Sequence, residues 1–271
     1  MRILFVGDVM GSAGRAALET YLPQLKTELR ADIAIVNGEN AANGRGITED
    51  ICRQFYAWGV DCITTGNHVW DCGDIRSYIA RDPRLLRPAN YPRGTPGKCL
   101  YIHRFPDGRR IAVINLLARL FMDPLDDPFR AMESLLAEHC LEEDFDAIFV
   151  DFHGEATSEK MAFAHCFDGR VSAVVGTHTH VPTADAHVLP GGTAYMSDAG
   201  MTGDYDSVIG MRKDLSIQRF VNSSSGDTFV PATGNTTLCG ALVVSDDESG
   251  HATAIQPVRI GNTLPPALPD I

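Results

Sequence analysis

The chain has 271 residues, of which 44% are hydrophobic and 21% are charged, the balance of an ordinary globular protein. Its 35 acidic and 23 basic side chains give a formal net charge of −12, which argues against a protein that grips duplex DNA or RNA through a basic face. No apolar run is long enough to cross a bilayer, and the N-terminal segment lacks the apolar core and cleavage pattern of a signal peptide.

Short apolar runs bounded by glycine or polar turns predict buried strands. In chain order these runs cover residues 3–6, 33–36, 62–65, 111–117, 147–150 and 171–175. Two later runs alternate in polarity and are typical of antiparallel strands, at residues 242–244 and 252–258. Apolar residues at helical spacing predict helices at residues 15–29, 48–58, 129–140 and 157–167.

Strands that alternate with helices indicate an α/β fold, with a mixed parallel and antiparallel sheet flanked by helices. Proline, glycine and aspartate predict loops at residues 87–97, 198–210 and 262–271. The sequence shows no internal repeat and no low-complexity linker, so we expect one domain over residues 1–271, with a small excursion around residues 90–110.

The seven cysteines indicate the redox environment of the protein. Their number is odd, and none of them forms a C-x-x-C pair. We therefore expect free thiols in a reduced, cytoplasmic protein.

Five of the predicted strands each end in a short polar cluster. The clusters are Gly7-Asp8, Gly38-Glu39-Asn40, Gly66-Asn67-His68, Phe152-His153-Gly154-Glu155 and Gly176-Thr177-His178-Thr179-His180. Any one of them alone is typical of a turn. In open α/β sheets, however, ligand sites form outside the carboxyl ends of the strands, so we expect the five clusters to converge there.

The side chains in these clusters are of metal-ligand type, with carboxylate and amide oxygens and imidazole nitrogens. Mixed oxygen and nitrogen ligands suit Mn, Fe, Zn or Co better than Ca or Mg. A carboxylate can bridge two cations, and two metals about 3.5–4 Å apart are the usual arrangement for phosphate ester hydrolysis. The sequence therefore predicts a dinuclear metal site.

At these residues the chain resembles the calcineurin-like metallophosphoesterase superfamily, whose pattern runs D-x-H, G-D, G-N-H, a lone histidine and G-H-x-H. The chain departs from that pattern at Met10, which replaces a histidine, and at Glu39, which replaces an aspartate. Both departures resemble a narrower bacterial family, the YmdB-like phosphodiesterases that act on 2′,3′-cyclic nucleotides. The segments GDVMG, TTGNHVWD, DFHGEATSEK, GTHTHVPTAD and MSDAGMTG look like that family, and the resemblance covers about residues 1–260.

The resemblance implies a metallophosphoesterase-type layered sheet with the site at the carboxyl ends of its strands. It implies two metal ions, with iron expected and manganese or zinc as alternatives. The implied metal ligands are Asp8, His180 and Asn40 for the first ion, Asn67, His153 and His178 for the second, and Glu39 as the bridge. His68 is the implied general acid, a role that suits a side chain that ordinarily titrates near neutrality.

The expected activity is hydrolysis of a small-molecule phosphate ester, a 2′,3′-cyclic nucleotide, to a nucleoside monophosphate. Two alternatives remain open: a phosphomonoesterase or 3′,5′-cyclic diesterase with the same metal chemistry, and a regulatory, RNA-associated binding protein. The net charge and the presence of His68, which is not needed to hold metal, argue against the second. A homo-oligomer is expected from the family and from base rates. Residues 198–207 are a candidate wall of the site, and Arg45 is a weaker candidate for a phosphate contact.

Overall fold

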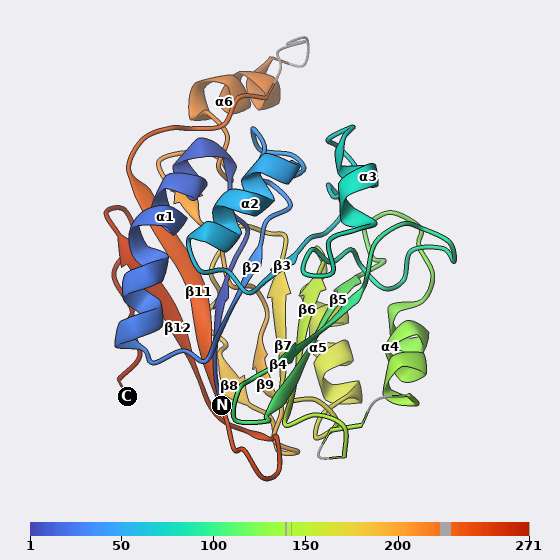
Figure 1. Cartoon of the computed structure of the whole chain (residues 1–271). Coiled ribbons are helices and arrows are strands. Elements are labelled where there is room, and N and C mark those ends of the chain that lie inside the picture. The colour runs from blue at the N-terminus through green and yellow to red at the C-terminus, as the bar shows by residue number, and fades with distance from the viewer. Residues whose placement is uncertain (139, 142, 223–228, 271) are drawn as a thin grey trace.

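The computed structural model describes residues 1–138, 140–141, 143–222 and 229–270. In the described residues, two six-stranded sheets pack against each other, with helices on their outer faces (Figure 1). The chain therefore has an α/β fold with mixed parallel and antiparallel strands, as the sequence predicts.

The first sheet has a parallel centre and antiparallel strands on one side. Its order is β10 (Gly203–Asp204), β11 (Thr236–Ser245), β1 (Arg2–Val6), β2 (Ile33–Asn37) and β3 (Cys62–Thr64), with β12 (Ala252–Gly261) also paired to β11. Strands β1, β2 and β3 are parallel, so their carboxyl ends lie at one edge.

The second sheet is likewise parallel in its middle. Its order is β4 (Leu100–Arg104), β5 (Arg110–Leu117), β6 (Ala147–His153), β7 (Ala173–Thr177), β9 (Ala194–Met196) and β8 (His187–Val188). Strands β5, β6, β7 and β9 are parallel, while β4 and β8 pair antiparallel at the two edges.

Six helices connect these strands along the described part of the chain. They are α1 (Gly11–Glu28), α2 (Glu49–Ala57), α3 (Ile75–Ile79), α4 (Pro128–Leu136), α5 (Thr157–Cys166) and α6 (Lys213–Val221). Two of them begin at side-chain caps that the sequence indicates, because Thr48 accepts from the N–H of Ile51 and Asp127 accepts from the N–H of Phe129.

Three clusters of buried apolar side chains fill the space between the layers of sheets and helices. Along β1, Ile3 and Phe5 point into the core between the sheets, whereas Leu4 and Val6 point toward α1 and α2. This alternation follows from the two-residue period of a strand, and both faces are apolar because both are covered. The third cluster packs α4 and α5 on the outer face of the second sheet.

The predicted elements differ from the observed ones mainly at their ends. Helix α1 begins at Gly11 rather than at residue 15, because its N-cap Met10 has no side-chain hydrogen bond that would mark the start. Helix α4 ends at Leu136 rather than at residue 140. The expected excursion around residues 90–110 contains β4, which extends the second sheet, and the predicted loop 198–210 contains β10. Residues 139 and 271, within the predicted helix 129–140 and tail 262–271, lie outside the described residues.

Two further observations concern the predicted environment. All seven cysteines are free thiols. Among the described residues, no helix combines the length and the apolar character needed to cross a membrane.

Candidate metal centre and active site

The polar clusters that follow five strands converge where the two sheets meet. Asp8 lies two residues beyond β1, Glu39 two residues beyond β2, and His153 is the last residue of β6. His178 follows β7 directly, and its backbone N–H donates to Asp8 Oδ2 at 2.9 Å. This bond links the carboxyl edge of the second sheet to that of the first.

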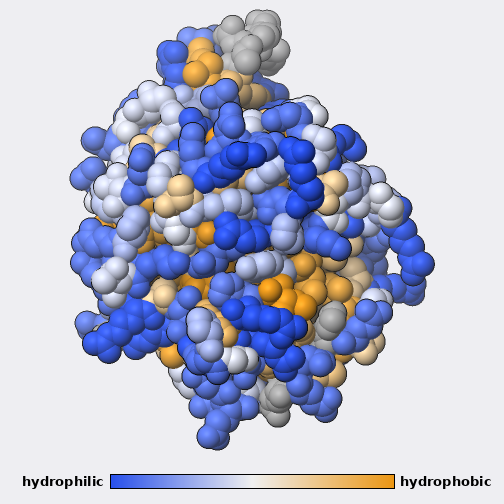
Figure 2. Space-filling view, viewed as in Figure 1, coloured by the Kyte–Doolittle hydropathy of each residue, from blue (hydrophilic) through white to orange (hydrophobic). Residues whose placement is uncertain are grey.

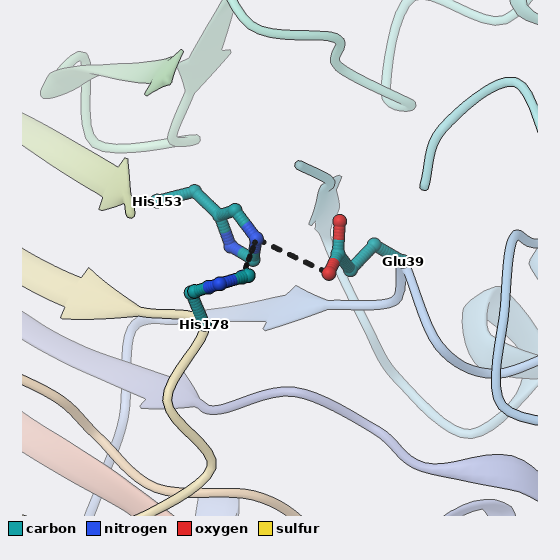
Figure 3. Close-up of side chains that lie close together, drawn as sticks. All are labelled: Glu39, His153 and His178. Carbon is teal, nitrogen blue, oxygen red and sulfur yellow. Dashed lines mark hydrogen bonds and ion pairs between the residues drawn. The ribbon is translucent and has the colours of Figure 1, made fainter. Parts of the chain in front are cut away.

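One group of metal-type donors surrounds His153. Its Nε2 lies 3.1 Å from Glu39 Oε1, 3.1 Å from Asn67 Oδ1 and 3.1 Å from His178 Nδ1. Figure 3 shows Glu39, His153 and His178 pointing toward one another from three separate elements. These three side chains offer ligand atoms that all lie within 4.8 Å of one another. Two imidazole nitrogens with a carboxylate and an amide oxygen form a donor set that suits a transition metal.

The second group lies on the other side of Asp8. His180 Nε2 is 3.3 Å from Asn40 Oδ1 and 4.0 Å from Asp8 Oδ2. His180 Nδ1 donates to the carbonyl of Ile209 at 2.8 Å, which leaves Nε2 directed at the two oxygens. The structure therefore brings together the seven predicted metal ligands as two neighbouring groups.

Asp8 has a buried carboxylate oxygen without a hydrogen-bond partner. Its side chain is fully buried, and its Oδ1 atom has no hydrogen-bond partner, the nearest imidazole nitrogen being His153 Nδ1 at 3.9 Å. An unpaired buried carboxylate oxygen is costly, because water can no longer solvate it. The donor set and this orphaned oxygen together fit a bound metal ion.

Burial and mutual charge perturb the protonation of the site. Burial raises the pKa of Asp8 well above its ordinary value, and the nearby charge of Glu39 adds to that effect. Burial also raises the pKa of Glu39, but the charge and hydrogen bond of His153 outweigh it and lower the value to about 2. Burial lowers the pKa of His153, whereas Glu39, Asp8 and Asp151 raise it to about 9. Burial and the charge on His153 lower the pKa of His178 to about 3.

A buried aspartate beneath the site supports His153. Asp151 accepts hydrogen bonds from Thr64 Oγ1 at 2.5 Å, Thr177 Oγ1 at 2.7 Å and Asn37 Nδ2 at 2.9 Å. His153 Nδ1 lies 2.8 Å from the same Thr177 hydroxyl. Because the hydroxyl proton of Thr177 points to the carboxylate, its oxygen accepts from His153 Nδ1–H, and the lone pair for a metal is then on Nε2.

A buried ion pair shapes the loop that carries the last two histidines. The ammonium group of Lys160 donates to Asp198 Oδ2 at 3.0 Å and to the carbonyl of Thr177 at 2.9 Å. Asp198 Oδ2 also accepts from the N–H of Thr179 at 2.9 Å. His178 between them has a φ of +106°, a strained conformation that these contacts hold in place.

The glycine that precedes Asn67 is required by close packing. A Cβ atom on Gly66 would overlap the imidazole of His153 and the carboxylate of Glu39. The backbone that follows β3 can therefore approach the metal-type ligands only because position 66 has no side chain.

His68 faces a pocket of about 350 Å³ above these groups. Its Nδ1 lies 2.9 Å from Asp71 Oδ2, and its backbone N–H donates to Glu39 Oε2 at 3.1 Å. The described lining residues are Met10, Glu39, Asn40, Gly44, Arg45, His68, Glu155, His178, Thr179, His180, Ile209, Met211 and Phe229. An imidazole thus lines the pocket and is oriented by a carboxylate.

The expected wall at residues 198–207 is not what the structure shows. None of those residues lines the pocket, and Ile209 and Met211, just beyond them, do so instead. Asp198, the first residue of that segment, instead accepts a hydrogen bond from the N–H of Thr179 and so holds the loop that carries the last two histidines. Sequence reasoning also missed Asp71, whose only signal is its position three residues after His68.

Comparisons with known proteins show the family of the chain. The YmdB-like protein family matches residues 4–258. The chain is 49% identical over 263 residues to a 2′,3′-cyclic-nucleotide 2′-phosphodiesterase of Bacillus subtilis (strain 168), covering 97% of this chain and 98% of the relative.

Two solved structures share the fold. A hypothetical protein from Thermus thermophilus has a TM-score of 0.90 and 43% identity, over 97% of this chain and 100% of that one. A novel phosphatase from Mycoplasma pneumoniae has a TM-score of 0.89 and 34% identity, over 96% of this chain and 93% of that one. The fold is that of the metallophosphoesterases, and the chain belongs to the YmdB-like protein family.

Proposed function

We propose that the chain is a dinuclear metal-dependent phosphodiesterase that hydrolyses 2′,3′-cyclic nucleotides to nucleoside monophosphates. The observation that carries the proposal is the pair of donor groups on either side of Asp8, whose Oδ1 is buried without a partner. The pocket above them reaches His68, and the substrate class is that of the Bacillus subtilis relative.

The proposed ligands follow the two groups. His153 Nε2, His178 Nδ1 and Asn67 Oδ1 would hold one ion. Asp8, Asn40 and His180 would hold the other, with Glu39 shared between them. When bound, the ions supply Lewis acidity toward the phosphate oxygens and favour deprotonation of water at neutral pH.

The residue at position 10 sets the donor chemistry of the Asp8 group. A histidine there would add an imidazole, but Met10 is buried at that position and lines the pocket, so the Asp8 group is richer in oxygen donors than the His153 group. We propose iron as the native metal from the family resemblance, with manganese or zinc as alternatives that such a donor set also accepts.

His68 is the proposed general acid. Its Nδ1–H donates to Asp71 Oδ2 at 2.9 Å, so the ring is held with Nε2 available to the pocket. In the proposed reaction, Nε2 gives its proton to the ribose oxygen as the P–O bond to that oxygen breaks, and water supplies the oxygen that phosphorus gains. One ester bond of the cyclic phosphate is thus opened.

A substrate panel with metal analysis tests the proposal. Protein purified without chelator is assayed against 2′,3′-cyclic AMP, 3′,5′-cyclic AMP and p-nitrophenyl phosphate, and its metal content is measured on the same sample. The proposal predicts a clear preference for the 2′,3′-cyclic diester, lost on chelation. A preference for p-nitrophenyl phosphate would establish the phosphomonoesterase alternative instead.

The location, domain organisation and partners of the chain are proposed as well. A cytoplasmic location is supported by the seven free thiols. A single domain over residues 1–271 is supported by the core between the sheets, which draws on residues from Met1 to Ile255. The small-molecule substrate is supported by the printed activity of the Bacillus subtilis relative. The net charge of −12 argues against stable binding to duplex nucleic acid or to an anionic membrane surface. The homo-oligomer is proposed from the family and from base rates.

A further inference from the structure

The pocket above the metal-type ligands has two chemically different sides. Its floor is polar and includes Glu39, His68 and His178, whereas another part is lined by Met10, Ile209, Met211 and Phe229, with Arg45 beside them. The proposed reaction uses the polar floor alone. The side chains of the apolar part donate no group to the proposed reaction, so their surface is free to bind the remainder of the substrate.

Phe229 is the aromatic member of this apolar wall and lies close to two arginines. The guanidinium carbon of Arg219 lies 4.5 Å from its ring centroid and that of Arg45 lies 5.8 Å from it. Phe229 is 38% exposed, so part of its surface remains open to a ligand. Arg219 comes from α6, which lies at the top of the view in Figure 1, where Figure 2 shows a small group of hydrophobic residues on the surface.

The wall is held at a fixed distance from the metal-type ligands. Gly44 N donates to Asn40 O at 3.1 Å, and Asn40 Nδ2 donates to Gly44 O at 3.1 Å, so a closed turn joins a predicted ligand to the residue before Arg45. A Cβ on Gly44 would lie 2.9 Å from Met10 Cε and 3.0 Å from Met211 Cε. The turn is thus packed directly against the two methionines.

The segment that carries Phe229 is tied to the same wall. Arg212 N donates to the carbonyl of Val230 at 2.9 Å, and Met211 forms an antiparallel bridge with Pro231. Met211 and Phe229 therefore belong to one connected surface, although they are far apart in the chain.

We propose that Phe229, Arg45, Met10 and Met211 form a nucleobase-stacking subsite, an inference that rests on the proposed function and specifies its substrate. A planar base has an apolar face that stacks on an aromatic ring or on the plane of a guanidinium group. Methionine side chains are polarisable and fit flat aromatic rings of varied shape. The described residues of the wall carry no side-chain amide or carboxylate, so the subsite accepts any base and favours purines through their larger face.

The first test compares two cyclic diesters, of which only one carries a nucleoside. One is 2′,3′-cyclic AMP and the other is ethylene phosphate, a five-membered cyclic diester with neither sugar nor base. Phe229→Ala is expected to raise KM for cyclic AMP by about tenfold, to leave kcat within about twofold and to leave ethylene phosphate hydrolysis unchanged. Phe229→Trp restores the KM. Phe121→Ala is the control, because Phe121 is 88% exposed and does not line the pocket.

Arg45 separates stacking on the base from contact with the phosphate. Arg45→Lys keeps the charge but loses the plane, so it is expected to raise KM for cyclic AMP severalfold and to leave ethylene phosphate unchanged. Equal losses with both substrates in the Arg45 and Phe229 variants would overturn the subsite and place these residues in phosphate binding or in folding.

A binding measurement without phosphate keeps the inference independent of the proposed reaction. Adenosine is added to the protein, and saturation transfer to the base protons is measured by NMR. Wild type and Phe121→Ala are expected to show transfer, and Phe229→Ala is expected to lose most of it. Wild-type protein that shows no transfer to adenosine overturns the subsite, whereas absent turnover of every diester overturns the proposed function alone.

Discussion

Asp151 offers the sharpest test of how the fold prepares His153. The substitution Asp151→Asn preserves the volume of the side chain but turns one acceptor into a donor. In the wild-type protein, Thr177 donates to Asp151 Oδ1 at 2.7 Å and His153 Nδ1 lies 2.8 Å from the Thr177 oxygen. With an amide N–H at the Oδ1 position, the Thr177 hydroxyl must donate to His153 Nδ1 instead, and the ring proton moves to Nε2.

The expected changes in stability and in metal affinity follow from the hydrogen bonds that each Asp151 variant loses. The other two bonds, from Thr64 and Asn37 to Oδ2, can persist to the amide oxygen, so the free energy of unfolding of Asp151→Asn is expected to fall by about 1 kcal/mol. Metal affinity is expected to fall by about 10–100-fold, the usual cost of disturbing the partner of a metal-bound histidine. Asp151→Ala leaves three donors unpaired and costs roughly 3 kcal/mol or more in stability.

The assay is metal release to a competing chelator, followed by metal analysis, with urea unfolding measured on the same variants. Thr64→Val is the matched control, since it removes one hydrogen bond to Asp151 without changing the proton on His153. It is expected to lose about 1 kcal/mol of stability and to keep its metal affinity. An Asp151→Asn protein that holds metal as tightly as wild type, or a Thr64→Val protein that loses metal equally, would refute the tautomer argument.

Three further predictions concern catalysis, packing and pH. His68→Ala is expected to keep its metal and to lose about 10²–10⁴ in kcat, the usual contribution of a general acid; an unchanged kcat would remove it from the mechanism. Gly66→Ala is expected to lower the free energy of unfolding by about 1–3 kcal/mol and to lower the metal content, because the added Cβ overlaps the ligand side chains. Gly73→Ala is expected to be neutral, because a Cβ there meets nothing within 4 Å. Burial raises the pKa of Asp185, but hydrogen bonds from Ser197 outweigh it and hold the pKa below its ordinary value, so the carboxylate stabilises the fold above about pH 4 and less as pH falls further. Asp185→Asn is therefore expected to show a shallower loss of stability in acid unfolding, and a steeper one would contradict this assignment.

The layout of the candidate site could be predicted because its residues lie at the carboxyl ends of strands. Parallel strands place their carboxyl ends at one edge, so polar residues that follow each strand are expected together without knowledge of the loops. Asp8, Glu39 and His153 follow this rule and lie within one cluster.

Asp151, which orients His153, and the residues Met211 and Phe229 of the apolar part of the pocket do not lie at strand ends. Asp151 lies inside β6 and resembles any buried strand residue until its three partners from other strands are seen. Met211 and Phe229 reach the pocket through pairings of irregular segments that have no periodic sequence signal. The short strands β8 and β10, of two residues each, are likewise set by their neighbours rather than by their own sequence.

If the chain hydrolyses 2′,3′-cyclic nucleotides with two bound metal ions, its turnover and its metal content must be lost and regained together. The most direct measurement is turnover of 2′,3′-cyclic AMP by the purified protein, with metal content determined on the same sample before and after chelation. We expect close to two metal ions per chain, turnover that disappears on chelation, and recovery of turnover when iron or manganese is restored. Protein that takes up no metal after reconstitution, or that hydrolyses the substrate equally well without metal, would contradict it.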